Sequence, residues 1–201
     1  MPLLEGYGLT EASPVVSCNP IDRPRKSGSV GLPIPGVRVR AVCEDGSVCP
    51  AGEVGEIAVK GDNVMKGYLG DDKATAEAIR DGWLMTGDMG YLDSEGYIYI
   101  VYRKKDLILV HGMNVYPREV EEVLYHHPEV LDAAVVGVTE GAHGEIPKAF
   151  VVKREGAELT ERELKEYLRE RLASYKIPRQ VEFLAMLPKS PTGKVLKKEL
   201  R

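Results

Sequence analysis

Long apolar runs are absent from this chain. No run approaches the ~18 to 20 residues that a membrane-spanning helix needs, and the N-terminus lacks the basic-then-apolar order of a secretory signal. These absences predict a soluble, cytoplasmic chain and leave peripheral association with a membrane open. At 201 residues and 43% hydrophobic content, the chain can still bury a core, as one domain or as two small ones.

Cysteine is also scarce. Cys18, Cys43 and Cys49 are odd in number, form no Cys-x-x-Cys pair and have no histidine nearby at ligand spacing. This pattern predicts neither a zinc site nor a disulfide framework. We therefore expect three ordinary thiols in a reducing compartment.

The chain has no excess of positive charge. Its net charge is -4, and no basic stripe interleaves with aromatic residues, so no nucleic acid partner is expected. The charge is nevertheless uneven, because residues 1 to 102 carry 9 Lys and Arg against 15 Asp and Glu, whereas residues 103 to 201 carry 18 against 16. The change of sign predicts two domains, 1–102 and 103–201.

The first domain is predicted to be rich in β-structure. Partly alternating apolar residues indicate strands at 36–42, 53–60 and 97–101, and a short helix is expected at 71–80. The sequence Asp-Ser-Glu-Gly at 93–96 predicts the turn of the last hairpin. Together these elements predict a small distorted β-barrel.

The second domain is predicted to mix helices and strands. Pro117 marks the start of a helix at 118–126, and Thr160 with Glu163 forms a capping box that opens a second helix. Apolar runs predict strands at 107–110, 130–138 and 148–153. The whole chain is thus expected to be α+β, with a β-rich unit followed by a small mixed α/β domain.

Residues 81 to 105 combine an acid, glycine turns and a basic cluster in one segment. Asp88 follows Gly87 in a Thr-Gly-Asp turn, and the alternating strand that comes later ends in three cations, at 103–105. An acid and three cations in one short segment predict a ligand site. A carboxylate in such a turn can accept hydrogen bonds from a neutral diol, whereas it adds little to an apolar core. The alternative is a surface hairpin with a solvated basic end.

Three further motifs occur in the remaining sequence, at residues 7–11 (YGLTE), 112–117 (GMNVYP) and 188–194 (PKSPTGK). With the segment 81–105, they resemble, in order, the four signature motifs of the adenylate-forming (AMP-binding) acyl-CoA synthetases. The resemblance runs from about residue 5 to the C-terminus and is nearest to the bacterial long-chain fatty acid-CoA ligases.

One motif of that family does not occur here. The Ser/Thr/Gly-rich phosphate loop and the region that forms the acyl pocket are absent from the 201 residues. In the family both lie upstream of the YGLTE motif, so we expect the chain to be the C-terminal piece of a larger enzyme, inactive alone, with the N-terminal region as its partner. Whether Met1 is native stays open, as do acyl chain length, oligomeric state and source.

The resemblance implies a role for each residue of the first motif. Tyr7 would stack on adenine, with Gly8 next to it in the nucleotide turn. Thr10 would hydrogen-bond the AMP phosphate, and Glu11 would help to hold Mg²⁺ as a hard oxygen ligand. Without the family, the same residues predict only a flexible aromatic turn.

Five residues further along receive roles in the same way. Asp88 and Arg103 would hydrogen-bond the ribose of ATP or AMP. Lys194 would stabilise charge at the reacting carboxylate and α-phosphate. Gly112 would let the arm of coenzyme A pass, and Lys105 would be the hinge between two catalytic poses.

Two departures from the family pattern and three competing functions stay open. Tyr102 stands where related synthetases mostly have Asp or Gly, and Met85 stands where many have His. The predicted function is activation of a fatty acid with ATP and its transfer to coenzyme A. The alternatives are an aryl-CoA ligase or peptide-synthetase adenylation domain, and a non-catalytic nucleotide-binding module.

The hinge assignment yields a prediction. Proline fixes φ near -65° and removes a backbone donor, so Lys105→Pro in the whole protein should restrict rotation at the joint. We expect the variant to keep adenylation, measured by pyrophosphate exchange, and to lose most thioester formation. Equal loss of both steps together with a lower melting temperature would make Lys105 a structural residue, and no loss would place the hinge elsewhere.

Overall fold

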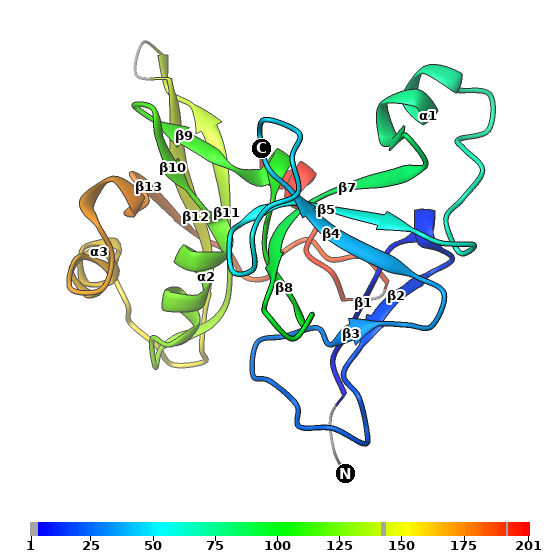
Figure 1. Cartoon of the computed structure of the whole chain (residues 1–201). Coiled ribbons are helices and arrows are strands. Elements are labelled where there is room, and N and C mark those ends of the chain that lie inside the picture. The colour runs from blue at the N-terminus through cyan, green and yellow to red at the C-terminus, as the bar shows by residue number, and fades with distance from the viewer. Residues whose placement is uncertain (1–3, 142–143, 192) are drawn as a thin grey trace. The chain divides into compact units, whose positions relative to one another are not determined.

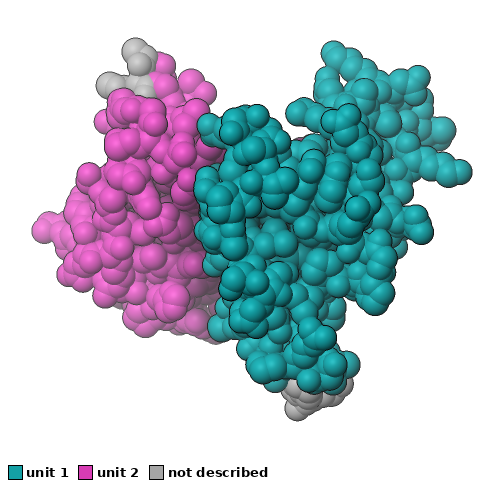
Figure 2. Space-filling model, in the orientation of Figure 1, with its two compact units in different colours: residues 1–104 teal, residues 105–201 magenta. Residues whose placement is uncertain are grey.

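A computed structural model describes residues 4–141, 144–191 and 193–201 as a mixed α+β chain, which confirms the predicted class (Figure 1). The chain divides into two compact units, Met1–Lys104 and Lys105–Arg201, coloured separately in Figure 2. The division falls two residues beyond the change of charge sign. Within the described ranges, no helix has the length and apolar content needed to cross a bilayer.

The described residues of unit 1, from residue 4 onward, form two sheets and one α-helix. The smaller sheet has the order β1-β2-β3, and the larger has the order β4-β5-β7-β6, with β8 also paired to β7. The strands are β1 (Gly6–Gly8), β2 (Val15–Cys18), β3 (Leu32–Pro33), β4 (Arg38–Val42), β5 (Gly55–Lys60), β6 (Ile79–Arg80), β7 (Trp83–Leu92) and β8 (Ile98–Arg103). Helix α1 (Asp72–Ala78) is capped by Asp71, whose side chain accepts a hydrogen bond from the backbone of Ala74.

One apolar core lies between the two sheets of unit 1. Val16 of the small sheet and Ile57, Leu84 and Ile98 of the large one are buried in the same cluster. Backbone hydrogen bonds also link Ile98 to residues 30 and 31, just before β3. The sheets therefore close around a shared interior, as expected for a barrel-like unit.

Two local expectations for unit 1 have different outcomes. The turn at 93–96 is confirmed, because the side chain of Asp93 accepts hydrogen bonds from the backbone N–H groups of Glu95 and Tyr97. The expected helix at 71–80 is too long. It ends at Ala78, and residues 79 and 80 form β6, which pairs with β7 because Ile79 adopts an extended conformation opposite Leu84.

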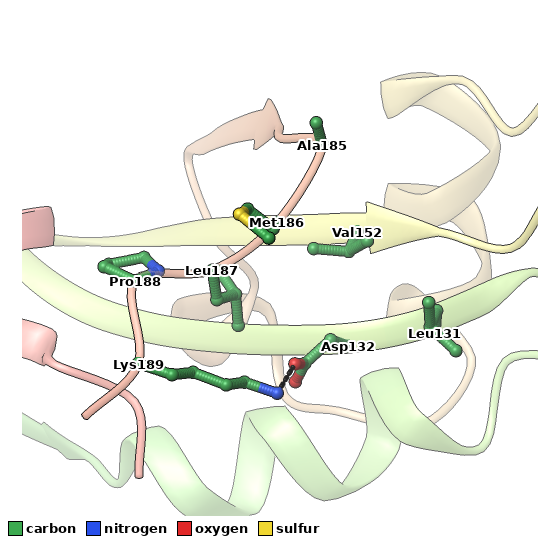
Figure 3. A pocket seen from close by; sticks show the side chains of 8 residues that line it. All are labelled: Leu131, Asp132, Val152, Ala185, Met186, Leu187, Pro188 and Lys189. Carbon is green, nitrogen blue, oxygen red and sulfur yellow. Dashed lines mark ion pairs between the residues drawn. The ribbon is translucent and has the colours of Figure 1, made fainter. Parts of the chain in front are cut away.

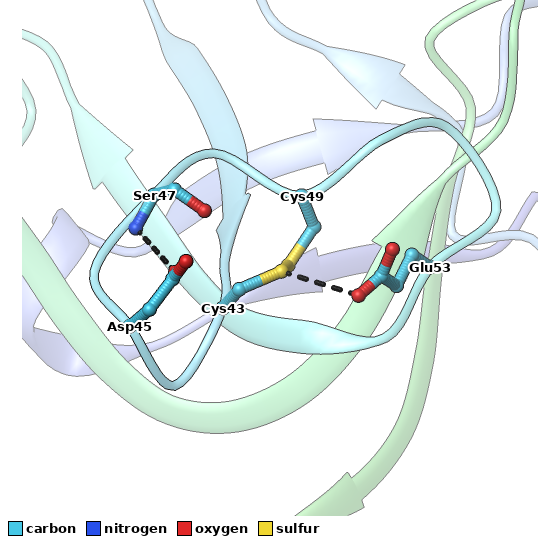
Figure 4. The surroundings of a disulfide bond; sticks show 5 residues. All are labelled: Cys43, Asp45, Ser47, Cys49 and Glu53. Carbon is cyan, nitrogen blue, oxygen red and sulfur yellow. Dashed lines mark hydrogen bonds between the residues drawn. A yellow bond between two sulfur atoms is a disulfide. The ribbon is translucent and has the colours of Figure 1, made fainter.

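The expectation of three free thiols is wrong for one pair. Cys43 and Cys49 form a disulfide, with Cα atoms 5.3 Å apart (Figure 4). The intervening turn brings them together, because Asp45 accepts a hydrogen bond from the Ser47 N–H and the backbones of Cys43 and Ser47 also pair. Cys18 is free and exposed. The predicted reducing compartment rested on free thiols and loses that support.

Outside its undescribed positions 142, 143 and 192, unit 2 combines a three-stranded sheet, a short hairpin and two α-helices. Strands β11 and β12 are antiparallel, whereas β12 and β13 are parallel and are connected through α3, as a parallel pair requires. The elements are β9 (Ile108–Val110), β10 (Met113–Val115), α2 (Pro117–Tyr125), β11 (Val130–Thr139), β12 (Glu145–Lys153), α3 (Glu161–Arg169) and β13 (Gln180–Phe183).

Both faces of the unit 2 sheet are buried. Alternate residues of β11 point to opposite sides, so Val135 joins the core formed with α2 and α3, and Val136 joins a second core formed with Leu187 and Leu200. Helix α3 begins with the predicted capping box, since Thr160 and Glu163 exchange both hydrogen bonds. Its apolar side buries Leu164 and Leu168 completely.

This packing predicts the effect of one truncation. Leu164 is 0% exposed and lies in the main core of unit 2, so Leu164→Ala should lower the free energy of unfolding by about 2 to 5 kcal/mol. Leu131→Ala is the matched control, because Leu131 is 54% exposed, and it should cost less than about 0.5 kcal/mol. Denaturant unfolding measures both, and equal losses would contradict the assigned core.

Candidate functional site

Asp88 lies at the centre of the candidate site in unit 1. Its side chain is 4% exposed, and its two carboxylate oxygens have different partners. The Tyr7 hydroxyl donates to Oδ2 at 2.6 Å, and Arg103 Nε donates to Oδ1 at 2.8 Å. Tyr7 comes from β1, Asp88 from β7 and Arg103 from its cross-strand position on β8. We call these three residues the carboxylate cluster.

The turn before Asp88 fixes the direction of its side chain. The Thr86 hydroxyl donates to the Ile57 carbonyl at 2.7 Å and accepts from the Asp88 N–H at 3.1 Å. Gly87 has φ of 71°, a left-handed conformation that favours glycine. Its N–H donates to Glu56 at 3.1 Å. The Thr-Gly-Asp motif thus positions the carboxylate of Asp88. No motif in the sequence predicted that Glu56 would hold this turn.

Tyr7 acts as a hydrogen-bond donor in this cluster. Burial, followed by the hydrogen bond to Asp88, raises the pKa of Tyr7 well above its ordinary value. The phenol therefore keeps its proton throughout the physiological range. Sequence reasoning assigned Tyr7 only to adenine stacking, which stays a prediction, and it did not anticipate the hydroxyl contact with Asp88.

A shallow hollow on the β1–β2 hairpin brings three predicted residues together. Tyr7, Gly8 and Thr10 all line it. A side chain at Gly8 has no room, because a Cβ there would lie 2.1 Å from the Pro14 carbonyl oxygen. Thr10 is exposed and begins the short 3-10 helix Thr10–Ala12 directly after β1. Glycine at position 8 therefore lets the chain at Pro14 and Val15 lie close to β1.

Glu11 has a hydrogen-bond partner outside the carboxylate cluster. Its Oε1 accepts from the Tyr68 hydroxyl at 2.9 Å, and this bond raises the pKa of Tyr68. A single carboxylate fits Mg²⁺, which is commonly held by one or two carboxylates together with the phosphates of the substrate. The donor set at Glu11 is therefore suitable for this ion. Tyr68 had no signal in the predicted motifs.

Gly112 lies in the tight turn between β9 and β10 of unit 2. His111 and Gly112 have φ of 50° and 79°, the pattern of a two-residue hairpin turn in which both central residues are left-handed. A Cβ at Gly112 would meet no atom within 4 Å. The backbone is therefore open on the side where the coenzyme A arm was predicted to pass.

Lys194 is exposed at the end of a compact loop in unit 2. Ser190 organises this loop, because its backbone exchanges hydrogen bonds with Gly193 and Lys194 and its hydroxyl accepts from the Lys194 N–H. Thr192 of the predicted motif lies outside the described residues. The Lys194 side chain projects from a defined turn on the chain surface.

An ion pair anchors the start of this loop to β11. Lys189 Nζ lies 2.5 Å from Asp132 Oδ2 beside a pocket whose lining includes Leu131 and Met186 (Figure 3). Burial raises the pKa of Asp132, but the hydrogen bonds from Lys189 and Tyr125 outweigh it and leave this pKa below the ordinary value. The lysine loop is thus attached to the sheet five residues before Lys194.

Lys105 is the first residue of unit 2. It lies in the 3-10 helix Lys104–Asp106, and its carbonyl accepts from Arg201 at 3.5 Å. On the other side of the division, Lys104 forms an ion pair with Glu56 within unit 1. The role of Lys105 as a hinge stays a prediction.

Two family descriptions match this chain: "AMP-binding enzyme" over residues 1–69 and "AMP-binding enzyme C-terminal domain" over residues 119–194. The chain belongs to the AMP-binding enzymes, the adenylate-forming family. Within that family, it is 51% identical over 199 residues to a long-chain-fatty-acid–CoA ligase of Escherichia coli and 49% identical to one of Bacillus subtilis. These alignments cover 99% and 98% of the chain.

Solved structures agree with these relatives. ATP-bound MatB from Rhodopseudomonas palustris has a TM-score of 0.94 at 40% identity, with 100% of this chain and 40% of that one covered. MenE of B. subtilis, an o-succinylbenzoate CoA synthetase in complex with an acyl-adenylate intermediate, has a TM-score of 0.86 at 39% identity, with 100% and 41% covered. The chain spans about a third of the length of its curated relatives, 35% of the E. coli ligase.

The contacts of the carboxylate cluster predict that two Tyr→Phe variants will differ in stability. Tyr7→Phe removes the donor to a buried carboxylate oxygen, so it should lower the free energy of unfolding by about 1.5 to 3 kcal/mol. Tyr68→Phe removes a comparable hydrogen bond at an exposed site and should cost less than about 1 kcal/mol. Urea titration of both variants measures the difference, and its absence would show that Oδ2 of Asp88 does not depend on Tyr7.

Proposed function

We propose that this chain is the C-terminal part of an AMP-forming ligase that activates a long-chain fatty acid with ATP and transfers the acyl group to coenzyme A. The main observation in support of this proposal is the buried Asp88 carboxylate, which Tyr7 and Arg103 hold by hydrogen bonds. The choice of substrate is supported by 51% identity over 199 residues to a long-chain-fatty-acid–CoA ligase. The reaction has two steps, and the chain supplies residues for each.

Asp88 suits recognition of the ribose of ATP. A carboxylate offers about four lone-pair sites, of which Tyr7 and Arg103 occupy two. The remaining sites can accept hydrogen bonds from both ribose hydroxyls. Tyr7 and Arg103 then act by holding the carboxylate in one orientation, and the hollow beside Tyr7, Gly8 and Thr10 receives the adjoining part of the nucleotide.

In the first step, a carboxylate oxygen of the acid attacks the α-phosphorus of ATP, and the bond to the β-phosphate breaks. Pyrophosphate leaves and an acyl-adenylate forms. Lys194 stabilises the charge that develops at the attacking oxygen and the α-phosphate, and Thr10 donates a hydrogen bond to the same phosphate. When bound, Mg²⁺ would neutralise phosphate charge, with Glu11 as its protein ligand.

In the second step, the thiol of coenzyme A loses its proton and attacks the acyl carbon, and the bond to AMP breaks. The turn at Gly112 leaves room for the pantetheine arm, because no atom occupies the position of a side chain there. Rotation at Lys105 would exchange the Lys194 surface for the Gly112 surface at the adenylate.

The complete activity belongs to a longer protein in this proposal. No Ser/Thr/Gly-rich phosphate loop ending in Lys-Gly occurs in the 201 residues, and the relatives are about three times as long. We therefore expect the 201-residue chain alone to make no acyl-adenylate, whereas the whole protein should do so.

An aryl-CoA ligase is the second candidate. The chain is 45% identical over its whole length to a 2-succinylbenzoate–CoA ligase of Bacillus cereus. Acyl-dependent pyrophosphate exchange by the whole protein, with palmitate and 2-succinylbenzoate offered separately, distinguishes the two. Faster exchange with the aryl acid would replace the fatty acid in the proposal and leave the reaction unchanged.

The role of Lys194 yields a prediction for the whole protein. Lys194→Ala should slow adenylation by about 10²- to 10³-fold, because it removes one charge-stabilising donor from the site. Conversion of supplied acyl-adenylate to acyl-CoA should continue. Lys198→Ala, which removes an exposed lysine four residues later, is the matched control and should leave both rates unchanged. Equal loss of both half-reactions in Lys194→Ala would contradict the assignment.

A further inference from the structure

The loop that carries Lys194 is a short hairpin, residues 188–196, which we call the lysine hairpin. The Leu196 N–H donates to the Pro188 carbonyl at 2.8 Å, and the Ser190 N–H donates to the Lys194 carbonyl at 2.8 Å. These bonds join the two sides of the hairpin. The direction of the Lys194 side chain therefore depends on how both sides are attached to the rest of unit 2.

One ion pair lies at each end of the lysine hairpin. Lys189 pairs with Asp132 on the side that enters the turn (Figure 3). Just beyond the side that leaves it, Lys197 Nζ lies 2.6 Å from Glu121 Oε1. The side chains of Lys197 and Glu121 are only 26% and 15% exposed, so salt screens this pair less than a pair on the open surface.

Both ion pairs lead back to one face of helix α2. Glu121 and Tyr125 are one helical turn apart on α2 and are therefore neighbours on its surface. Glu121 pairs directly with Lys197. The Tyr125 hydroxyl donates to Asp132 Oδ1 at 2.6 Å, while the other oxygen of Asp132 pairs with Lys189. A single turn of α2 thus holds both ends of the hairpin.

The carboxylate of Glu121 is itself fixed by a second partner. The Val135 N–H donates to the same Oε1 at 2.7 Å. Val135 belongs to β11, which lies at one edge of the three-stranded sheet, and the backbone donors at a sheet edge need acceptors. Glu121 is therefore held by the sheet as well as by its helix, and it gives Lys197 an anchor in a defined place.

A purely structural role for this ion pair is the alternative. Leu187 and Leu200, on either side of the hairpin, are buried in the second core of unit 2, and Val195 packs against the same core. These apolar contacts attach the segment to the sheet without any charge. What the ion pair adds is control over the chain between them, where Lys194 lies.

We propose that Glu121 is a positioning residue for Lys194 and that it acts through Lys197 during formation of the acyl-adenylate. Charge in the transition state is stabilised best by a donor that is already in place. A hairpin anchored at one end only would let the Lys194 ammonium leave that place. The inference rests on the proposed function, because it concerns the step assigned to Lys194.

Glu121→Gln in the whole protein tests the proposal. Glutamine keeps an oxygen acceptor for the Val135 N–H but removes the charge that holds Lys197. We expect palmitate-dependent pyrophosphate exchange to slow about 10- to 10²-fold with an unchanged KM for ATP, because a misplaced catalytic group lowers the rate without loss of binding. Conversion of supplied acyl-adenylate to acyl-CoA should continue at its original rate.

Glu119→Gln is the matched control on the same helix. Glu119 pairs with Lys176 at 2.6 Å, and this pair joins α2 to the 3-10 helix Ser174–Lys176 rather than to the lysine hairpin. The variant should leave the rate of adenylation unchanged. An equal loss in the two variants would assign the effect to α2 as a whole and overturn the role of Glu121.

Two substitutions of Lys197 test the same ion pair from its other side. Lys197→Met removes the charge and should reproduce the loss of adenylation, whereas Lys197→Arg keeps a cation and should retain most of the rate. Both leave the contact between Glu121 and Val135 intact, so they report on the ion pair even if Glu121→Gln does not fold. Equal rates in the two variants would contradict the proposal.

A double variant separates positioning from stability. In the Lys194→Ala background, Glu121→Gln should slow adenylation no further, because the group that it positions is already absent. Further slowing in that background, or equal loss of both half-reactions in Glu121→Gln, would make the ion pair structural. An unchanged adenylation rate in Glu121→Gln would also overturn the proposal.

Amide hydrogen exchange gives a readout that does not depend on activity. The Leu196 and Ser190 N–H groups, which close the hairpin, should exchange faster in Glu121→Gln and at the original rate in Glu119→Gln. Unchanged exchange in both would show that Glu121 does not hold the hairpin. Intact adenylation in Lys194→Ala would instead refute the proposed role of Lys194, so the two failures are distinguishable.

Discussion

Burial of the Asp88 carboxylate is the constraint on which the rest of unit 1 depends. A carboxylate withdrawn from water is costly unless donors satisfy its oxygens, and these donors come from β1 and β8, which are distant in sequence. Their positions require the β7–β8 hairpin in its observed register and the small sheet packed against the large one. The candidate site therefore forms only when unit 1 adopts this fold, and loss of the contacts with Asp88 would destabilise the fold.

Strand β7 links the functional features of unit 1. It pairs with β5, β6 and β8, so it is an interior strand of the large sheet. One side of it buries Leu84 in the core, the other carries Trp83 against the Arg40 guanidinium, and its later part holds Asp88. A slip of one residue in this strand would exchange the buried and exposed sides. It would disrupt the core, the contact of Trp83 with Arg40 and the carboxylate cluster at once.

Local signals predicted many elements well. The capping box at Thr160 and the turn at 93–96 depend on residues within four positions of each other, and both occur as expected. Two expectations failed although the partners lie only three to six positions apart, because a strand pairing overrides the helical pattern in one case and a tight turn joins two cysteines in the other. Residues 79 and 80 leave the helical pattern because β7 offers them strand partners, and the disulfide depends on a turn that brings Cys43 back to Cys49.

The sequence by itself determined the family, the α+β class and the motifs at Tyr7, Asp88, Gly112 and Lys194, because each motif is a short run of specific residue types. Only the tertiary structure decided that the Tyr7 hydroxyl reaches Asp88, 81 positions away. It alone places Arg38, Arg40 and Lys60 around the ring of Trp83. The reason is physical: strand pairing places side chains within about 5 Å across a sheet, and no spacing along the chain encodes which strands will be neighbours.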